Sequence, residues 1–128
     1  MIRGGILHPG LNRILSETGH TDILTICDRG FPVPTGPERL DLALVDNIPT
    51  VLDVLSAIHK QFVIDRIIIT EEMEQISPDR AQTLRSMFPD IKMDKVSHQQ
   101  LKEICRDSRA VIRTGDTVPY ANIMIISG

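Results

Sequence analysis

Short apolar runs alternate with amphipathic stretches along most of the 128 residues. The apolar runs are strand-sized, and several are rich in β-branched residues with little polar alternation, which is typical of strands covered on both faces. The run at 91–96 instead alternates apolar and polar residues, which favours a place at the sheet edge. Strands are therefore predicted at 23–27, 42–45, 66–70, 91–96, 110–114 and 122–127.

Helical periodicity and helix-end signals occupy the stretches between these runs. Thr50 and Asp53 have capping-box spacing, and a Ser-x-x-Gln box opens at Ser97. Ser77 has the character of a cap, and Pro78 after it suits the first helical position. Helices are predicted at 9–18, 50–62, 77–88 and 97–108.

Strands separated by helices of this length predict an α/β fold with a largely parallel central sheet flanked by helices. The sequence has no internal repeat and no linker, so residues 1–128 are expected to form a single domain. Ligands of such sheets collect at the carboxyl ends of the strands. Asp28 follows the first predicted strand, and Glu71 and Glu72 follow the third.

Composition narrows the classes of function. The net charge is −3 and no cluster of Lys and Arg with interleaved aromatics is present, so no nucleic-acid partner is expected. No apolar run is long enough to span a membrane, and residues 1–20 lack the pattern of a secretion signal, so a cytoplasmic location without membrane association is expected. Cys27 and Cys105 stand alone and are expected to be reduced thiols, although the sequence does not exclude a disulfide.

Motifs for cofactors are absent from the sequence. It contains neither a GxGxxG nor a P-loop pattern, and it has no GxSxG nucleophile elbow. The four histidines are scattered without metal-ligand spacing, so no metal site is expected. Candidate chemistry therefore rests on polar residues at the ends of predicted elements.

His98 occupies the first helical position after the Ser97 cap. The helix dipole disfavours imidazolium there, which predicts a mostly neutral His98 at pH 7. A neutral imidazole both donates and accepts hydrogen bonds, and Lys102 lies one turn further on the same face. Both side chains could reach one ligand, although a solvated helix face would explain them too.

His20 and Asp28 bracket the predicted strand at 23–27. A histidine near its reference pKa of about 6.5 suits proton transfer at neutral pH. The plainer alternatives are a histidine that caps the preceding helix and an aspartate that closes a turn. In the stretch 118–123, the Tyr120 phenol and the Asn122 amide lie in one bend that leads into an apolar strand. They form either part of a polar ligand site or an ordinary turn. Together these residues are typical of a site for a small, uncharged polyhydroxy compound.

Four motifs in order carry a family resemblance: TGHTD at 18–22, DRGFPVP at 28–34, SHQQLK at 97–102 and AVIRTGDTVPYANIMI at 110–125. In these motifs the chain resembles the D-ribose pyranase family, the RbsD-type sugar mutarotases, which are related to the L-fucose mutarotases. The resemblance extends from about residue 3 to residue 127. The PYAN and PVP versions of the motifs place the chain with the ribose branch.

The resemblance implies an isomerase that interconverts β-D-ribopyranose and β-D-ribofuranose without a metal or an organic cofactor, and that supplies furanose to ribokinase. It implies a cytoplasmic homo-oligomer, a decamer of stacked five-membered rings with sites at subunit boundaries. It assigns the catalytic proton donor to His20. The substrate contacts that it implies are Asp28, His98, Tyr120, Ala121 and Asn122, with Lys102 as an addition.

Three residues depart from the family pattern. Arg29 stands where a small residue is usual, and it could lower the pKa of Asp28 or favour an anionic sugar. Phe31 replaces an aliphatic residue, and Asp116 stands where glutamate is common. Two alternatives therefore stay open: a mutarotase for another sugar, such as L-fucose or a sugar acid, and a non-catalytic sugar-binding accessory protein.

Overall fold

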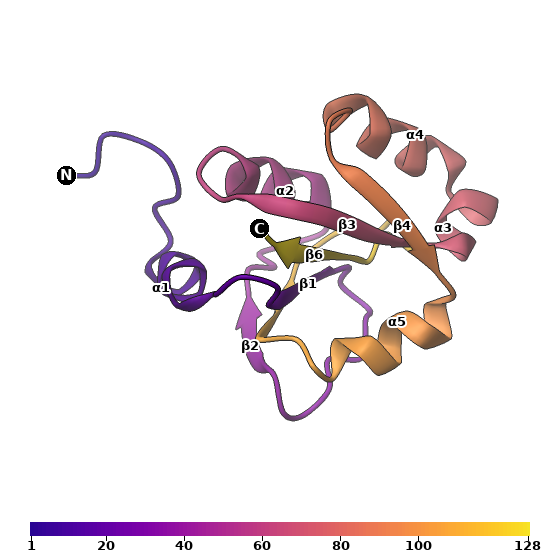
Figure 1. Cartoon of the computed structure of the whole chain (residues 1–128), viewed down its shortest axis with the longest axis horizontal. Coiled ribbons are helices and arrows are strands. Elements are labelled where there is room, and N and C mark those ends of the chain that lie inside the picture. Colours follow the sequence, from indigo (N-terminus) through magenta and orange to yellow (C-terminus); the bar gives the residue numbers. More distant parts are fainter.

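Six strands form one sheet in the computed structural model, which describes residues 1–128 (Figure 1). The strands lie in the order β2-β5-β1-β6-β3-β4, and only β6 runs antiparallel to its neighbours. Their bounds are β1 Ile23–Cys27, β2 Glu38–Asp41, β3 Ile64–Thr70, β4 Lys92–Val96, β5 Ala110–Arg113 and β6 Ile123–Ser127. The predicted α/β fold with a largely parallel sheet is confirmed, and β4 is the predicted edge strand.

This topology gathers several loops at one edge of the sheet. The five parallel strands all end there, and β6 begins there because it runs the other way. The segments after β1, β4 and β5 and the segment before β6 therefore lie at the same edge, although they are far apart in sequence.

Helices cover both faces of the sheet (Figure 1). The larger core cluster, of 21 buried residues, joins one face to four helices, and the smaller cluster, of 6, joins the opposite face to α5. Successive residues of β6 pack into opposite cores: Ile123 and Ile125 lie in the larger cluster and Met124 lies in the smaller one. The helices are α1 Pro9–Glu17, α2 Val51–His59, α3 Glu71–Ile76, α4 Pro78–Met87 and α5 His98–Cys105. None of them combines the length and apolar character needed to cross a membrane.

The strand predicted at 42–45 is wrong. β2 lies just before it, at Glu38–Asp41, and pairs only with β5. An edge strand with mostly exposed side chains needs no apolar run, so its ERLD sequence gave no strand signal. Leu44 and Val45 are instead 76% and 58% exposed, in a turn closed by a bridge between Val45 and Ile48.

Helix ends follow the predicted caps with one exception. The capping boxes opened by Thr50 and Ser97 are both present, and Pro78 occupies the first turn of α4. Ser77 makes no capping hydrogen bond, because its hydroxyl donates to the Pro119 carbonyl oxygen instead, at 2.6 Å. The short helix α3 was not predicted; Thr70 caps it by accepting a hydrogen bond from the Met73 N–H.

Candidate functional site

A cavity of about 290 Å³ opens at the carboxyl edge of the sheet. Three segments line it: the loop after β1, the start of α5 and the turn before β6. This is the edge at which sheets of this class bind ligands. The lining residues are Asp28, Gly30, Phe31, Pro32, His98, Pro119, Tyr120 and Asn122.

Asp28 and Asn122 connect two walls of this cavity. The Asp28 N–H donates to Asn122 Oδ1 at 2.8 Å, and Asp28 Oδ1 accepts from the Gly30 N–H at 3.0 Å. Burial raises the pKa of Asp28 above its ordinary value, although hydrogen bonds from the backbone of Gly30 and Phe31 act in the opposite direction. The carboxylate is therefore partly desolvated and suited to accept hydrogen bonds from ligand hydroxyls.

His98 forms the second polar wall. Its backbone N–H donates to both carboxylate oxygens of Glu72, each at 3.0 Å, which fixes the start of α5. Its ring packs edge-to-face against Phe31 and Tyr120, with ring centroids 6.2 and 5.1 Å away. Its Nδ1 is buried and has no hydrogen-bond partner within the chain.

The protonation of His98 follows from this environment. Burial, and then the positive charge of Lys102, lower the pKa of His98 below its ordinary value. The direction agrees with the predicted neutral imidazole, and burial, which the sequence did not indicate, is the first cause. A neutral imidazole in the cavity can donate from one nitrogen and accept at the other.

Tyr120 has an unusual backbone conformation. Its φ of 57° lies in the left-handed region, which non-glycine residues rarely adopt. Ala121 and Asn122, which follow it, are 0% and 2% exposed. The turn before β6 therefore presents the phenol and the amide to the cavity from a tightly enclosed segment.

Three of the predicted site residues do not line this cavity. His20 precedes β1 and is exposed, so it lies at the opposite edge of the sheet from Asp28. The five-residue strand between them spans roughly 16 Å at about 3.3 Å per residue. Lys102 lies one turn into α5 and Ala121 is buried behind the wall, so one chain brings together only Asp28, His98, Tyr120 and Asn122.

The expected influence of Arg29 on Asp28 is wrong. Arg29 Nη1 pairs with Asp46 Oδ1 at 2.7 Å, and both side chains are more than half exposed. The pKa of Asp28 is raised and not lowered. Asp28, His98 and Tyr120 are the only ionisable residues that line the cavity, and no Lys or Arg side chain does so.

Four lining residues were not predicted as contacts: Gly30, Phe31, Pro32 and Pro119. Three of them belong to the DRGFPVP motif at 28–34. That motif could therefore have indicated these residues as well as Asp28. No group of three or more His, Cys, Asp or Glu side chains is placed to hold a metal ion.

Comparisons with known proteins agree on one family. Residues 1–128 match the RbsD / FucU transport protein family. A D-ribose pyranase of Geobacillus thermodenitrificans is 40% identical, with 100% of this chain and 97% of that protein covered. A D-ribose pyranase of Kosmotoga olearia is 37% identical, with 100% and 98% covered.

Solved structures show the same similarity. Bacillus subtilis RbsD, solved in complex with D-ribose, has a TM-score of 0.95 and 34% identity, with 100% of this chain and 98% of that chain covered. The fucose mutarotase of Streptococcus pneumoniae, solved with L-fucose, has a TM-score of 0.77 at 20% identity, with 95% and 93% covered. The second likeness shows the shared fold alone.

Proposed function

This chain belongs to the RbsD / FucU transport protein family, and from that premise we propose that it is a D-ribose pyranase. It interconverts β-D-ribopyranose and β-D-ribofuranose by opening and reclosing the sugar ring. The relatives named D-ribose pyranase, which match along the whole chain, support this assignment. The similarity to an RbsD that binds D-ribose supports the choice of sugar.

The observation that carries the proposal is the chemistry of the cavity. A carboxylate, a neutral imidazole, a phenol and an amide converge on it, without a Lys or Arg among them. These groups match the hydroxyls of a neutral sugar, which both donate and accept hydrogen bonds. A sugar acid would bring its negative charge beside Asp28 with no Lys or Arg side chain of this chain lining the cavity to balance it, so a neutral sugar is the better fit.

The reaction breaks one C–O bond and forms another, and proton transfer is the only catalysis that these steps need. A base removes the proton of the anomeric hydroxyl while an acid protonates the ring oxygen, and the C–O bond of the ring breaks to give the open aldehyde. The aldehyde then recloses through a different hydroxyl, which returns both protons. General acid–base catalysis supplies about 10²–10⁴-fold, or roughly 3–5 kcal/mol, which suits a ring opening that already occurs in water.

The proton carrier in this proposal is His20 of a neighbouring copy of the chain. Because His20 lies across the sheet from the cavity of its own chain, it can act only on a cavity that another copy provides. This arrangement requires a homo-oligomer, and we propose the decamer of stacked pentamers that the family resemblance implies. The exposed apolar side chains of Leu44, Val45 and Ile48 are consistent with burial between copies.

The other candidate residues have separate roles. Asp28, His98, Tyr120 and Asn122 bind sugar hydroxyls from within the cavity. Ala121 contributes through its backbone, and Lys102 acts through its charge, which lowers the pKa of His98. The enzyme works in the cytoplasm, where the furanose that it produces is the form passed to ribokinase.

The test is NMR saturation transfer between the ring forms of ribose, with and without catalytic amounts of the protein. The wild type is expected to accelerate pyranose–furanose transfer, and His20→Ala is expected to lose that acceleration while it still binds ribose. If the folded wild type accelerates the exchange of L-fucose and not of ribose, the substrate is L-fucose and the proposed substrate is wrong. Ribose binding without exchange, equal in wild type and His20→Ala, would instead indicate a binding accessory.

A further inference from the structure

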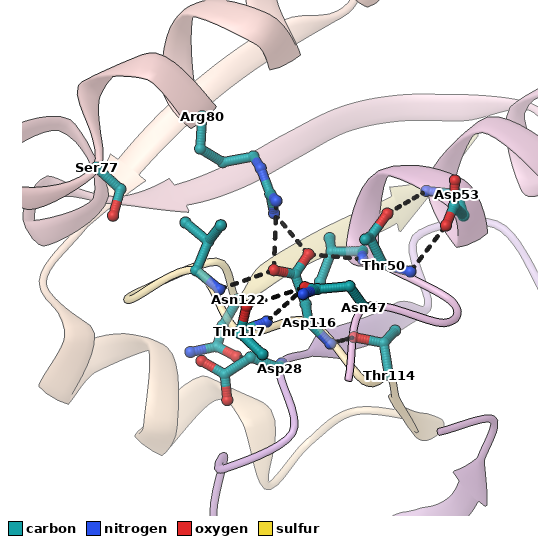
Figure 2. Close-up of polar contacts among 12 residues, drawn as sticks. Asp28, Asn47, Thr50, Asp53, Ser77, Arg80, Thr114, Asp116, Thr117 and Asn122 are labelled. Atoms are coloured by element: carbon teal, nitrogen blue, oxygen red, sulfur yellow. Dashed lines mark hydrogen bonds and ion pairs between the residues drawn. The ribbon is translucent and has the colours of Figure 1, made fainter. Parts of the chain in front are cut away.

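Asp116 is a fully buried carboxylate behind the cavity, in the loop after β5. Arg80 of α4 reaches it with two guanidinium nitrogens, Nη1 to Oδ2 at 2.7 Å and Nη2 to Oδ1 at 3.3 Å (Figure 2). The Arg80 side chain is only 9% exposed. The N–H groups of Val51 and Val118 also donate to this carboxylate, at 2.9 and 3.0 Å.

Asp116 is hydrogen-bonded to the backbone of two segments that form walls of the cavity. Its carboxylate holds the N–H of Val118, at the start of the turn that carries Tyr120 and Asn122. Its backbone carbonyl oxygen accepts from the Arg29 N–H at 3.1 Å, directly after Asp28. Burial alone would raise the pKa of Asp116, but hydrogen bonds from Arg80 and from the N–H groups of Val118 and Val51 lower it below its ordinary value.

A second contact reaches the same turn from the beginning of α4. The Ser77 hydroxyl donates to the Pro119 carbonyl oxygen at 2.6 Å instead of capping its own helix. Pro119 lies between Val118 and the left-handed Tyr120. A backbone in that sparsely populated region persists only when its surroundings impose it. Ser77, directly, and Arg80, through Asp116, therefore hold the two residues just before this unusual residue, from the start of a helix that does not line the cavity.

We propose that Ser77 and Arg80 are positioning residues of the sugar site, which fix residues 118–122 through Pro119 and Asp116 and so set the affinity for ribose. The inference rests on the proposed function, because it assigns these residues to the sugar site. A purely structural role for the same contacts would change the stability of the fold and leave the affinity of the folded protein for ribose unchanged.

Ser77→Ala is the first test, because it removes one hydrogen bond and leaves the ion pair intact. The KM for ribose in the NMR exchange assay is expected to rise about 3- to 10-fold, the effect of one lost hydrogen bond, with kcat changed less than about twofold. Thr83→Ala is the matched control: its hydroxyl donates to the Asp79 carbonyl oxygen within α4, at 2.9 Å, and makes no hydrogen bond to the turn. Its KM is expected to equal that of the wild type.

Arg80 requires a paired design, since its loss alone would leave a buried charge on Asp116. Arg80→Lys keeps the charge and is expected to raise KM less than the double variant Arg80→Met/Asp116→Asn, which removes both charges. Hydrogen–deuterium exchange of residues 117–122 is expected to be faster in Ser77→Ala and in the double variant. If the double variant does not fold, Ser77→Ala and Arg80→Lys decide the question.

Wild-type KM and wild-type amide protection in folded Ser77→Ala and in the folded double variant would overturn the inference. A wild type that fails to exchange ribose would instead defeat the proposed function. The two failures are distinguishable, because the amide exchange of residues 117–122 is measured without any sugar.

Discussion

Asp28 is a residue at which the needs of binding and of folding oppose each other. Its carboxylate is partly buried, and burial raises its pKa above that of an ordinary aspartate. A carboxylate whose pKa is raised on folding contributes stability that is lost as the pH rises through the folded pKa. At pH 7 the charge therefore reduces the free energy of unfolding, while in the proposed site it would be a strong acceptor for a sugar hydroxyl.

Asp28→Asn is predicted to be more stable than the wild type at pH 7 and to bind ribose about tenfold or more weakly, because hydrogen bonds to charged groups contribute roughly 1.5–3 kcal/mol. The amide oxygen can still accept from the Gly30 N–H, so the turn is kept. The gain in stability should be smaller at pH 4 than at pH 7, because the wild-type carboxylate takes up protons as the pH falls. Urea unfolding at both pH values and ribose titration by NMR measure the two effects; a less stable variant at pH 7 would contradict the account.

Among single residues, the polar side chains of the cavity could be predicted from the sequence better than the apolar ones. A strand-end aspartate and a histidine at a helix start are visible as patterns, and the structure places Asp28 and His98 in one cavity. Phe31 and Pro119 line the same cavity but belong to loops, whose paths depend on contacts distant in sequence. The partner of Arg29 was unpredictable for the same reason, because Asp46 meets it through the turn that follows β2.

Among the elements, α5 has the closest connection to the site, because its first residue is His98. Ser97 caps this helix by accepting from the Gln100 N–H at 3.1 Å, and the Gln100 side chain accepts from the Ser97 N–H at 2.9 Å. The first turn of α5 thus sets the position of the imidazole in the cavity.

Ser97→Ala is predicted to lower the free energy of unfolding by about 0.5–2 kcal/mol, the usual loss for a helix cap, and to weaken ribose binding. Ser97→Asn should restore both properties, since asparagine caps helices as well as serine does. Ser16→Ala is the control: its hydroxyl donates to the Arg13 carbonyl oxygen on the exposed side of α1, away from the cavity. Urea unfolding at one fixed protein concentration, with ribose titration, measures the set, and wild-type values for Ser97→Ala would contradict it.

Elements were predictable where apolar burial leaves a local signal in the sequence. The helix at 97–108 combines an apolar face with a capping box, the strand at 23–27 is a short apolar run, and α5 and β1 lie within those ranges. β2 escaped prediction because its side chains face solvent, and its place is decided by β5, about seventy residues later in the chain. α3 is a six-residue helix whose Thr70 cap also ends a strand, so its signal merged with that of β3.

For the whole molecule, the direction of β6 decides which loops meet. An apolar run such as that at 122–127 predicts a strand but carries no information on its direction. Because β6 runs antiparallel between β1 and β3, the turn before it joins the loops that follow the parallel strands. The same topology places His20 at the opposite edge of the sheet from the cavity of its own chain, so a site that holds both His20 and Asp28 must lie between copies. The proposed site needs two copies.

The most direct measurement of that claim is the ribose exchange rate of mixed oligomers, formed by co-expression of His20→Ala and Asp28→Asn chains. Each parent oligomer is expected to be almost inactive at ribose concentrations well below KM. If His20 acts on the cavity of a neighbouring copy, random mixing of equal amounts restores both groups in about one site in four, and exchange should recover to about a quarter of the wild-type rate. Mixed oligomers no more active than their parents would contradict a site shared between copies.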